Sequence, residues 1–245
     1  MPTLRALIWR RTDFRESSRI VTLITRAEGR VAALAKGAHR PQSQFLGRID
    51  LLNLVDARVS GRGSLRLLSR IDVLEDRRPL RQAPRFLAAS HLVELFEPAF
   101  LDGRVDEPLF DLLLGAIHLL ERCPPAAIPQ VLLGVELRYL EALGLLPPLR
   151  HCGLCASGPT HLAADRRSLR CAAHREGSRT RVDAENLAWL VQLAASPGKA
   201  WPSLPSPPRL GAVLGLVGGF LEAAVERQLR LRRAAFGAEA GPGSA

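Results

Sequence analysis

The sequence predicts an α+β protein, in which an N-terminal five-stranded β-barrel is followed by a mainly α-helical body. Residues 1–80 contain five short apolar segments that fit β-strands and are separated by turn residues, and the second of them is rich in β-branched residues. Most later segments carry apolar residues at helical spacing. A cluster of cysteines interrupts this helical part. The chain has 245 residues, of which 47% are hydrophobic, so two modest domains with buried cores can form.

The five predicted strands follow one another closely in the sequence. The turns between them are polar or contain glycine, as at residues 13–18 and 61–63. Residues 37–47 do not follow a strand pattern and are expected to form an open loop. Five short strands favour a small closed barrel, and the OB-fold is the common five-stranded form. We therefore predict an OB-fold domain over residues 1–80, with strands at residues 4–10, 19–26, 30–36, 49–60 and 65–74.

The remaining residues, 81–245, are predicted to form the helical domain. Asp106 is a candidate N-cap, and Pro108 fits the first turn of the helix that follows. The proline-rich segment 196–208 predicts a linker. A cysteine-containing element, residues 151–180, is expected between two helices. The apolar periodicity predicts helical segments at residues 84–101, 109–120, 128–146, 183–195 and 210–236.

The positive charge of the chain is concentrated near its N-terminus. The formal net charge is +10, and residues 1–80 hold fifteen Arg and one Lys against eight acidic residues, a net charge of +8. Such an excess favours a polyanionic partner. Arginine matches phosphate geometry and stacks on bases. Codon bias toward arginine is an alternative explanation of the Arg/Lys ratio, although not of the net charge.

Two ligand pairs, Cys152-Gly-Leu-Cys155 and Cys171-Ala-Ala-His174, give the strongest chemical signal. Each pair can form a tight knuckle that presents two donors to a tetrahedral metal ion, and fifteen residues separate the pairs. The intervening segment is too polar to fold by burial alone, so a metal ion would stabilise it. Unrelated thiols with a surface histidine are the alternative, and His151 or His161 could replace His174. The predicted cofactor is a structural Zn²⁺ bound by Cys152, Cys155, Cys171 and His174.

Cationic residues surround two parts of the predicted barrel, the first turn and the loop after the third strand. If the first three strands are neighbours, these cations share one face and can neutralise several phosphates. Trp9, Phe14 and Phe45 are close enough to stack on bases, although Trp9 fits the barrel core better. A solvated strand edge is the alternative interpretation. The candidate DNA-binding residues are Arg10, Arg11, Arg15, Arg19, Lys36, His39, Arg40 and Arg48.

No catalytic residue is assigned, because the sequence contains no phosphate-binding Walker loop, no dinucleotide fingerprint and no convincing nucleophile–base set. The acidic group Asp102, Asp106 and Glu107 could bind a metal ion, but a helix cap in a solvated loop explains it better. The sequence shows no secretory signal, and its longest apolar run, residues 211–221, is too short to span a bilayer. We therefore expect a cytoplasmic protein without membrane contact, and binding to DNA would place it at the nucleoid.

Several ordered motifs resemble the bacterial recombination mediator family RecO. The run RRTDFRESSRIVTLITRAEGRVAALAKGAHRP, residues 10–41, resembles the family's arginine-rich first strand, turn and hairpin. FDLLLGAIHLLE at residues 110–121, VELRYLEALGLLP at residues 135–147, and the cysteines that follow also resemble the family. The resemblance covers about residues 4–235. One departure is His174, which stands where family members with a metal site commonly have a fourth cysteine.

The resemblance implies an OB-fold, a helical body and an inserted zinc-ribbon-like element. It also implies a non-enzymatic DNA-repair protein that binds single- and double-stranded DNA and anneals complementary strands. The implied partners are RecR, single-strand-binding protein and RecA, which it would help to load on coated DNA. Two other hypotheses remain at this point. One is an RNA-binding or transcription-associated OB/zinc protein, and the other is a metal-dependent nuclease centred on residues 102–107.

Overall fold

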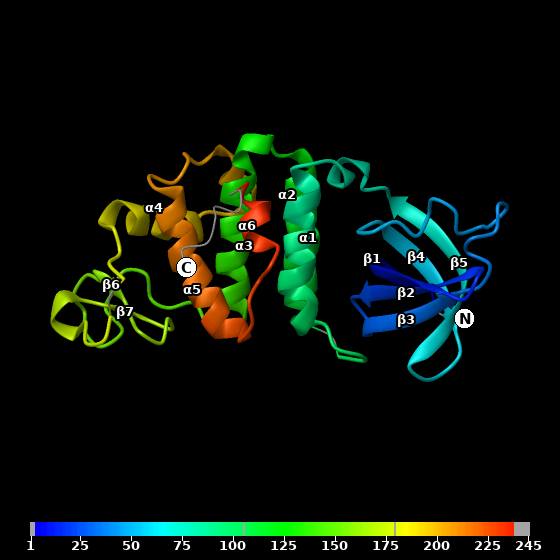
Figure 1. The fold of residues 1–245 in the computed structure, drawn as a ribbon, viewed down its shortest axis with the longest axis horizontal. Coiled ribbons are helices and arrows are strands. Elements are labelled where there is room, and N and C mark those ends of the chain that lie inside the picture. The colour runs from blue at the N-terminus through cyan, green and yellow to red at the C-terminus, as the bar shows by residue number, and fades with distance from the viewer. Residues whose placement is uncertain (1–2, 105, 179, 238–245) are drawn as a thin grey trace, which may run out of the picture. The chain divides into compact units, whose positions relative to one another are not determined.

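The computed structural model describes residues 3–104, 106–178 and 180–237. The chain divides into two compact units. The first comprises Met1–Gln82 and Leu95–Asp111 and contains a β-barrel, drawn in blue and cyan in Figure 1. The second comprises Ala83–Glu94 and Leu112–Ala245 and is mainly helical. No described helix is both long enough and apolar enough to cross a membrane.

The barrel is closed by five strands in the order β1-β2-β3-β5-β4. All neighbouring pairs are antiparallel except β3 and β5, which run parallel. The predicted five-stranded OB-like barrel is therefore confirmed. Two strands differ from the expected bounds, because β1 continues into the first turn and β4 begins five residues later. The strands are β1 (Thr3–Phe14), β2 (Ser18–Thr25), β3 (Gly29–Ala35), β4 (Leu54–Ser60) and β5 (Leu65–Glu75).

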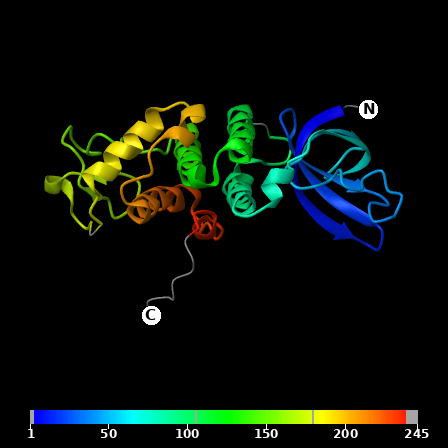
Figure 2. The same cartoon turned by 90° about the horizontal axis from the view of Figure 1, so that it is seen from above.

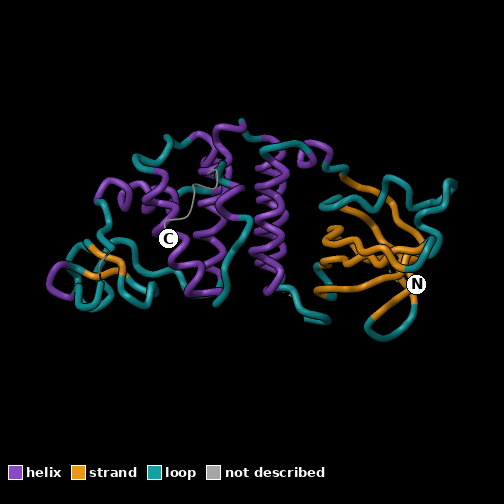
Figure 3. Tube along the Cα trace, in the orientation of Figure 1, coloured by secondary structure: helices purple, strands orange, loops and turns teal. Residues whose placement is uncertain are grey.

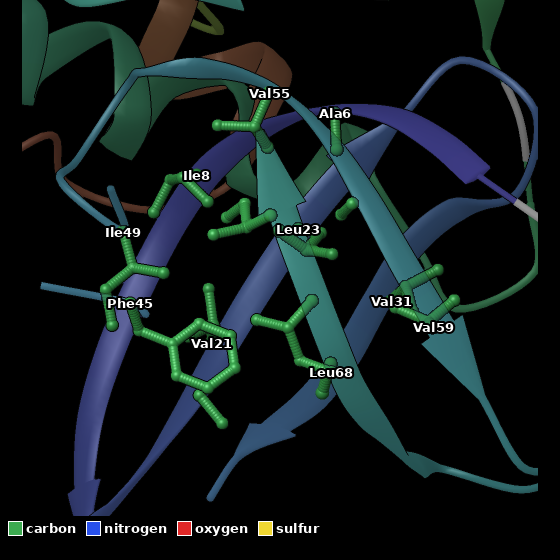
Figure 4. Close-up of a cluster of buried hydrophobic side chains, with 14 of the residues drawn as sticks. Ala6, Ile8, Val21, Leu23, Val31, Phe45, Ile49, Val55, Val59 and Leu68 are labelled. Atoms are coloured by element: carbon green, nitrogen blue, oxygen red, sulfur yellow. The ribbon is translucent and has the colours of Figure 1, made fainter. Parts of the chain in front are cut away.

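Alternate residues of the five strands fill the barrel, as their period-two patterns require (Figure 4). Ile8, Val21 and Leu23 are fully buried there. The ring of Phe45, from the loop between β3 and β4, joins the same core and is only 2% exposed. The expectation that Phe45 stacks on bases is therefore wrong, because this loop contributes an apolar side chain to the barrel core.

Trp9 is also buried, but it lies on the outer side of β1. Its ring is 3% exposed and contacts Phe100 edge-on, with 5.9 Å between ring centroids. Phe100 stacks in turn on Phe96. Close backbone approach fixes the same segment against the barrel. A Cβ on Gly29, whose φ is +66°, would lie 2.0 Å from the Arg104 carbonyl oxygen. Trp9 therefore anchors a covering segment and does not present a surface for bases.

The helical unit is arranged around α3, which packs against α4 and α5 (Figures 1 and 2). Most α3 side chains are buried, as expected of an apolar central helix. The α-helices of the chain are α1 (Arg85–Phe96), α2 (Glu107–Arg122), α3 (Ile128–Ala142), α4 (Ala184–Ala195), α5 (Leu210–Val225) and α6 (Arg232–Ala235). Short 3-10 turns occur at η1 (Arg78–Arg81), η2 (Glu97–Ala99), η3 (Pro125–Ala127), η4 (Ala172–His174) and η5 (Gly198–Ser203).

Two sequence-based expectations for this unit are wrong. The last helix is not continuous, because α5 ends at Val225 and the next residue, Glu226, adopts a left-handed conformation with φ of 52°. The proline-rich segment is not a free linker either. Trp201 within it is 3% exposed and donates from Nε1 to the Leu193 carbonyl oxygen at 3.1 Å. Its ring packs on Gly134, where a Cβ would come within 2.4 Å of the indole.

A buried ionic network joins three helices of this unit. The carboxylate of Glu136 on α3 accepts two hydrogen bonds from Arg232 on α6, at 2.7 and 2.8 Å. It also contacts His91 Nε2 on α1 at 2.8 Å. Burial opposes ionisation of Glu136, but the charge of Arg232 and these hydrogen bonds outweigh it and lower the pKa to about 2. The network therefore fixes the position of α6 after the break that follows α5.

Candidate metal centre and nucleic-acid interface

The cysteine-containing element is a small loop-rich module between α3 and α4. Two short strands, β6 (His161–Leu162) and β7 (Leu169–Arg170), form its only named sheet within the described residues (Figure 3). Its first knuckle is closed by Cys155 N–H, which donates to the Cys152 carbonyl oxygen, and its second by the η4 turn. The two knuckles bring sequence-distant donors together, as their two-residue spacing predicts.

The four predicted ligands lie in one cluster. The donor atoms of Cys152, Cys155, Cys171 and His174 are all within 4.8 Å of one another. Cys155 Sγ is 3.8 Å from Cys171 Sγ, and His174 Nδ1 is 3.4 Å from Cys171 Sγ. Donors about 2.0–2.3 Å from a tetrahedral ion are separated by about 3.5–3.8 Å. The donor set therefore fits a four-coordinate metal ion, because three of its donor–donor distances, 3.4 to 3.8 Å, are already close to those of a tetrahedral site.

The surrounding backbone favours an ionised thiol in this cluster. Burial raises the pKa of Cys152, but backbone N–H donors, led by that of Leu154, lower it to about 6. The two competing histidines lie elsewhere: His151 Nδ1 contacts the Ala156 carbonyl oxygen at 3.3 Å, and His161 Nδ1 contacts the Thr160 hydroxyl at 2.8 Å. Among the described residues, the three cysteines and His174 form the one group of three or more potential ligands that can hold a metal ion.

The candidate DNA-binding cations fall into two groups with different surroundings. Three arginines of the first group are neutralised by carboxylates of their own unit. Arg10 pairs with Glu97 at 2.6 Å, Arg11 with Asp50 at 2.5 Å, and Arg19 with Asp13 at 2.7 Å. The Arg19 hydrogen bond is the main cause of the lowered pKa of Asp13. These arginines have less charge to offer a phosphate than the sequence alone suggests.

The second group consists of exposed cations without a carboxylate partner among the described residues. Lys36 and Arg40 project from the loop that follows β3, and Arg15 lies 5.3 Å from the Phe14 ring in the turn after β1. Arg48 is exposed as well and donates to the Ile71 carbonyl oxygen at 3.3 Å. It has no ion pair among the described residues, but its charge contributes, after Arg70, to the lowered pKa of Asp72. This group of Arg15, Lys36, Arg40 and Arg48 forms the open part of the basic surface.

The loop between β3 and β4 is held in place from both sides. His39 N–H donates to the Ser17 carbonyl oxygen, and His39 Nε2 contacts Asp13 at 3.0 Å. On the other side, the Gln44 side-chain amide donates to the Ser69 carbonyl oxygen at 3.0 Å. His39 therefore positions the loop through Asp13, and the loop is anchored between the β1–β2 turn and β5.

One candidate was missed in the sequence. Arg62 is exposed in the turn between β4 and β5, and no carboxylate pairs with it among the described residues. The β1–β2 and β4–β5 loops of OB-folds are where nucleic acids bind. The Gly61-Arg62-Gly63 sequence predicts a turn between two strands, and the arginine at its centre could have been added to the predicted basic surface.

The acidic group near residue 102 has structural partners. Asp102 pairs with Arg30 at 2.7 Å, and Glu107 pairs with Arg26 at 3.1 Å. Asp106 caps α2 by accepting from the Leu109 N–H at 3.1 Å. These contacts explain all three carboxylates, so a nuclease centre at this position has no support.

These features define a class of protein: an OB-like barrel with a basic surface, followed by helices that carry a four-ligand metal element. Two family models match the chain, "Recombination protein O N terminal" over residues 1–77 and "Recombination protein O C terminal" over residues 81–233. The chain belongs to the RecO family.

Named relatives agree with this membership. A DNA repair protein RecO from Anaeromyxobacter sp. (strain K) is 32% identical over 249 residues, covering 98% of this chain and 96% of the relative. The corresponding proteins of Symbiobacterium thermophilum and Exiguobacterium sibiricum are 34% and 33% identical over 62% and 69% of this chain, and over 60% and 69% of their own lengths. The chain is thus similar over most of its length to DNA repair proteins.

Proposed function

We propose that this protein is a non-enzymatic recombination mediator, which binds single- and double-stranded DNA and anneals complementary strands. The observation that carries the proposal is the group of exposed cations without carboxylate partners on the barrel, above all Lys36 and Arg40. Family membership supplies the DNA-repair context.

The mechanism we propose is electrostatic. The cations at Arg15, Lys36, Arg40, Arg48 and Arg62 hold phosphate backbones and reduce the repulsion between two strands, so that pairing becomes favourable. Arg10, Arg11 and Arg19 contribute less, because Glu97, Asp50 and Asp13 already neutralise them. His39 has a positioning role through Asp13. No covalent step is required.

The metal in this proposal is Zn²⁺, and its role is structural. Three thiolates and one imidazole suit Zn²⁺ better than Mg²⁺ or Ca²⁺, which prefer oxygen ligands. Four protein ligands leave no open coordination position for a water or a substrate. The metal would therefore hold the two knuckles together and take no part in a reaction.

The proposed partners beyond DNA are RecR, single-strand-binding protein and RecA. The protein, together with RecR, would help RecA to replace single-strand-binding protein on DNA. A strand-annealing assay tests the core of the proposal, with complementary strands coated by single-strand-binding protein and measured at two salt concentrations. We expect the protein to accelerate annealing, less so at high salt, and Lys36→Glu with Arg40→Glu to remove most of the acceleration. Full activity of that double variant at both salt concentrations would exclude this surface from the mechanism.

A further inference from the structure

The metal-binding element carries a positive surface that the barrel does not explain. Residues 150–182 contain seven arginines against two acidic residues, Asp165 and Glu176. A metal-held module needs little surface charge for its fold, because its ligands supply the stabilisation. So large an excess in 33 residues is itself unfavourable through self-repulsion, and calls for a polyanionic partner.

The arginines of the element divide into paired and unpaired ones, as in the barrel. Arg166 pairs with Glu222 of α5 at 2.5 Å, and Arg167 pairs with Glu226 at 3.3 Å. Four other arginines have no carboxylate partner among the residues that the structure describes. They are Arg150, Arg170, Arg175 and Arg181, of which Arg170 is half-buried and the others are exposed.

Strand pairing places two of the unpaired arginines in one row. His161 of β6 lies opposite Arg170 of β7, and an antiparallel bridge on its other side joins it to Arg181. Directly opposed residues of antiparallel strands have their side chains on the same face. Arg170 and Arg181 therefore flank His161 on one face. The Arg170 guanidinium also lies over the first knuckle, because a Cβ on Gly153 would come within 2.6 Å of it.

A cavity of about 730 Å³ continues this surface between the element and helices α4 to α6. Arg181 and Arg233 line it, and neither has a carboxylate partner among the described residues. Two carboxylates, Asp183 and Glu222, also line it, but they are paired with Arg209 and Arg166. Asn186 of α4 also lines it and is 2% exposed. Its Oδ1 accepts from the Arg209 N–H at 3.0 Å, whereas its Nδ2 has no hydrogen-bond partner. A buried donor without an acceptor is costly, and an anion that accepts from it would remove that cost.

We propose that this metal-element surface, defined by Arg170, Arg181, Arg233 and Asn186, is a second phosphate-binding site for nucleic-acid backbone, separate from the barrel surface. The inference rests on the proposed function, since that function supplies a nucleic acid as the polyanion. One chain then has two sites for two strands. The barrel holds the first strand, and the metal-element surface captures the second.

The test uses the full-length, metal-loaded protein and two non-complementary single strands, one labelled with a donor fluorophore and the other with an acceptor. Energy transfer then reports that one protein particle holds both strands, without base pairing. The test variant is Arg170→Gln with Arg181→Gln. The matched control is Arg138→Gln with Arg167→Gln, which removes the same charge from arginines that Glu141 and Glu226 already neutralise and that do not line the cavity. One metal ion per chain in each variant shows that the element is intact.

We expect the test variant to bind a single labelled strand within about twofold of the unmodified protein, and to lose energy transfer at least about tenfold. The control variant should lose less than about twofold. An equal loss of energy transfer in both variants, or no loss in either, would overturn the proposal of a second site. No transfer with the unmodified protein would also overturn it, and would leave the proposed barrel function standing. Unchanged single-strand affinity of the Lys36→Glu, Arg40→Glu variant would instead count against the proposed function.

Discussion

The barrel and the metal-binding element are both small and basic, but different interactions stabilise them. The barrel buries a continuous cluster that includes Ile8, Leu23 and Phe45. The element has a much smaller apolar interior, in which Leu162 and Leu169 are the largest buried aliphatic residues, and it gathers four metal ligands instead. Apolar burial fixes the first module, and we propose that metal coordination fixes the second. A module fixed by a metal can carry a largely polar sequence, which leaves more of its surface for charged residues.

Metal removal should produce the largest difference in stability between the two modules. Structural Zn²⁺ contributes on the order of 10 kcal/mol to the folding of comparable small elements. We expect Cys152→Ser with Cys155→Ser, or treatment with a strong chelator, to abolish metal binding and to remove hydrogen-exchange protection from residues 150–182. The barrel amides should keep their protection. If the element kept its hydrogen-exchange protection without metal, the claim that metal coordination stabilises it would be contradicted.

A substitution in the barrel core should destabilise the barrel and leave the metal-binding element intact. Phe45→Ala leaves a cavity in the barrel and should lower its free energy of unfolding by about 3–5 kcal/mol, with the metal content unchanged. The neighbouring Leu46 is 68% exposed, so Leu46→Ala should change stability by less than about 0.5 kcal/mol. Denaturant unfolding followed by barrel-specific probes measures both. Similar effects at the two positions would show that the loop does not contribute to the core.

The helical body depends on a third kind of interaction, the ion pair of Glu136. The folded-state pKa of about 2 lies below the ordinary value of 4.5, so this group adds stability that is complete above pH 4.5 and is lost as the pH falls toward 2. The loss should reach about 3 kcal/mol for the native protein. Glu136→Gln should be less stable at neutral pH and should lose this part of the acid dependence. If the stability of that variant fell with pH as steeply as that of the native protein, the acid dependence would come from other groups.

The smallest expected effect concerns the carboxylates within the barrel surface. Asp13 engages both Arg19 and His39. Asp13→Asn should release Arg19 for phosphate and raise single-stranded DNA affinity about two- to fivefold, a small change because the Asp13–Arg19 pair is screened by solvent. Fluorescence anisotropy at low salt measures the change. Asp56→Asn is the control, because Asp56 pairs with Arg5, outside the proposed surface. A decrease in affinity would mean that loop anchoring by Asp13 outweighs the freed charge.

Local patterns made part of this architecture predictable. The short apolar strand segments and the turns between them predicted the five-stranded barrel, and the two ligand spacings predicted the metal cluster with His174 as a member. Contacts between distant residues were not predictable. Nothing near Arg10 in the sequence indicates Glu97, and nothing near Trp201 indicates that Gly134 leaves room for its ring. The position of α6 after that break depends on the buried pairing of Arg232 with Glu136, which is also non-local.

The central claim is that DNA is held by the barrel cations without carboxylate partners, and not by those already paired. The most direct measurement is the salt dependence of single-stranded DNA affinity in two variants that lose equal charge, Lys36→Gln with Arg40→Gln and Arg10→Gln with Arg11→Gln. For the first, the slope of log K against log salt should fall in magnitude by about 1.4, or ~0.7 for each lost phosphate contact. For Arg10→Gln with Arg11→Gln, we expect the slope to change by less than about half of that amount. Equal changes in the two variants would contradict the claim.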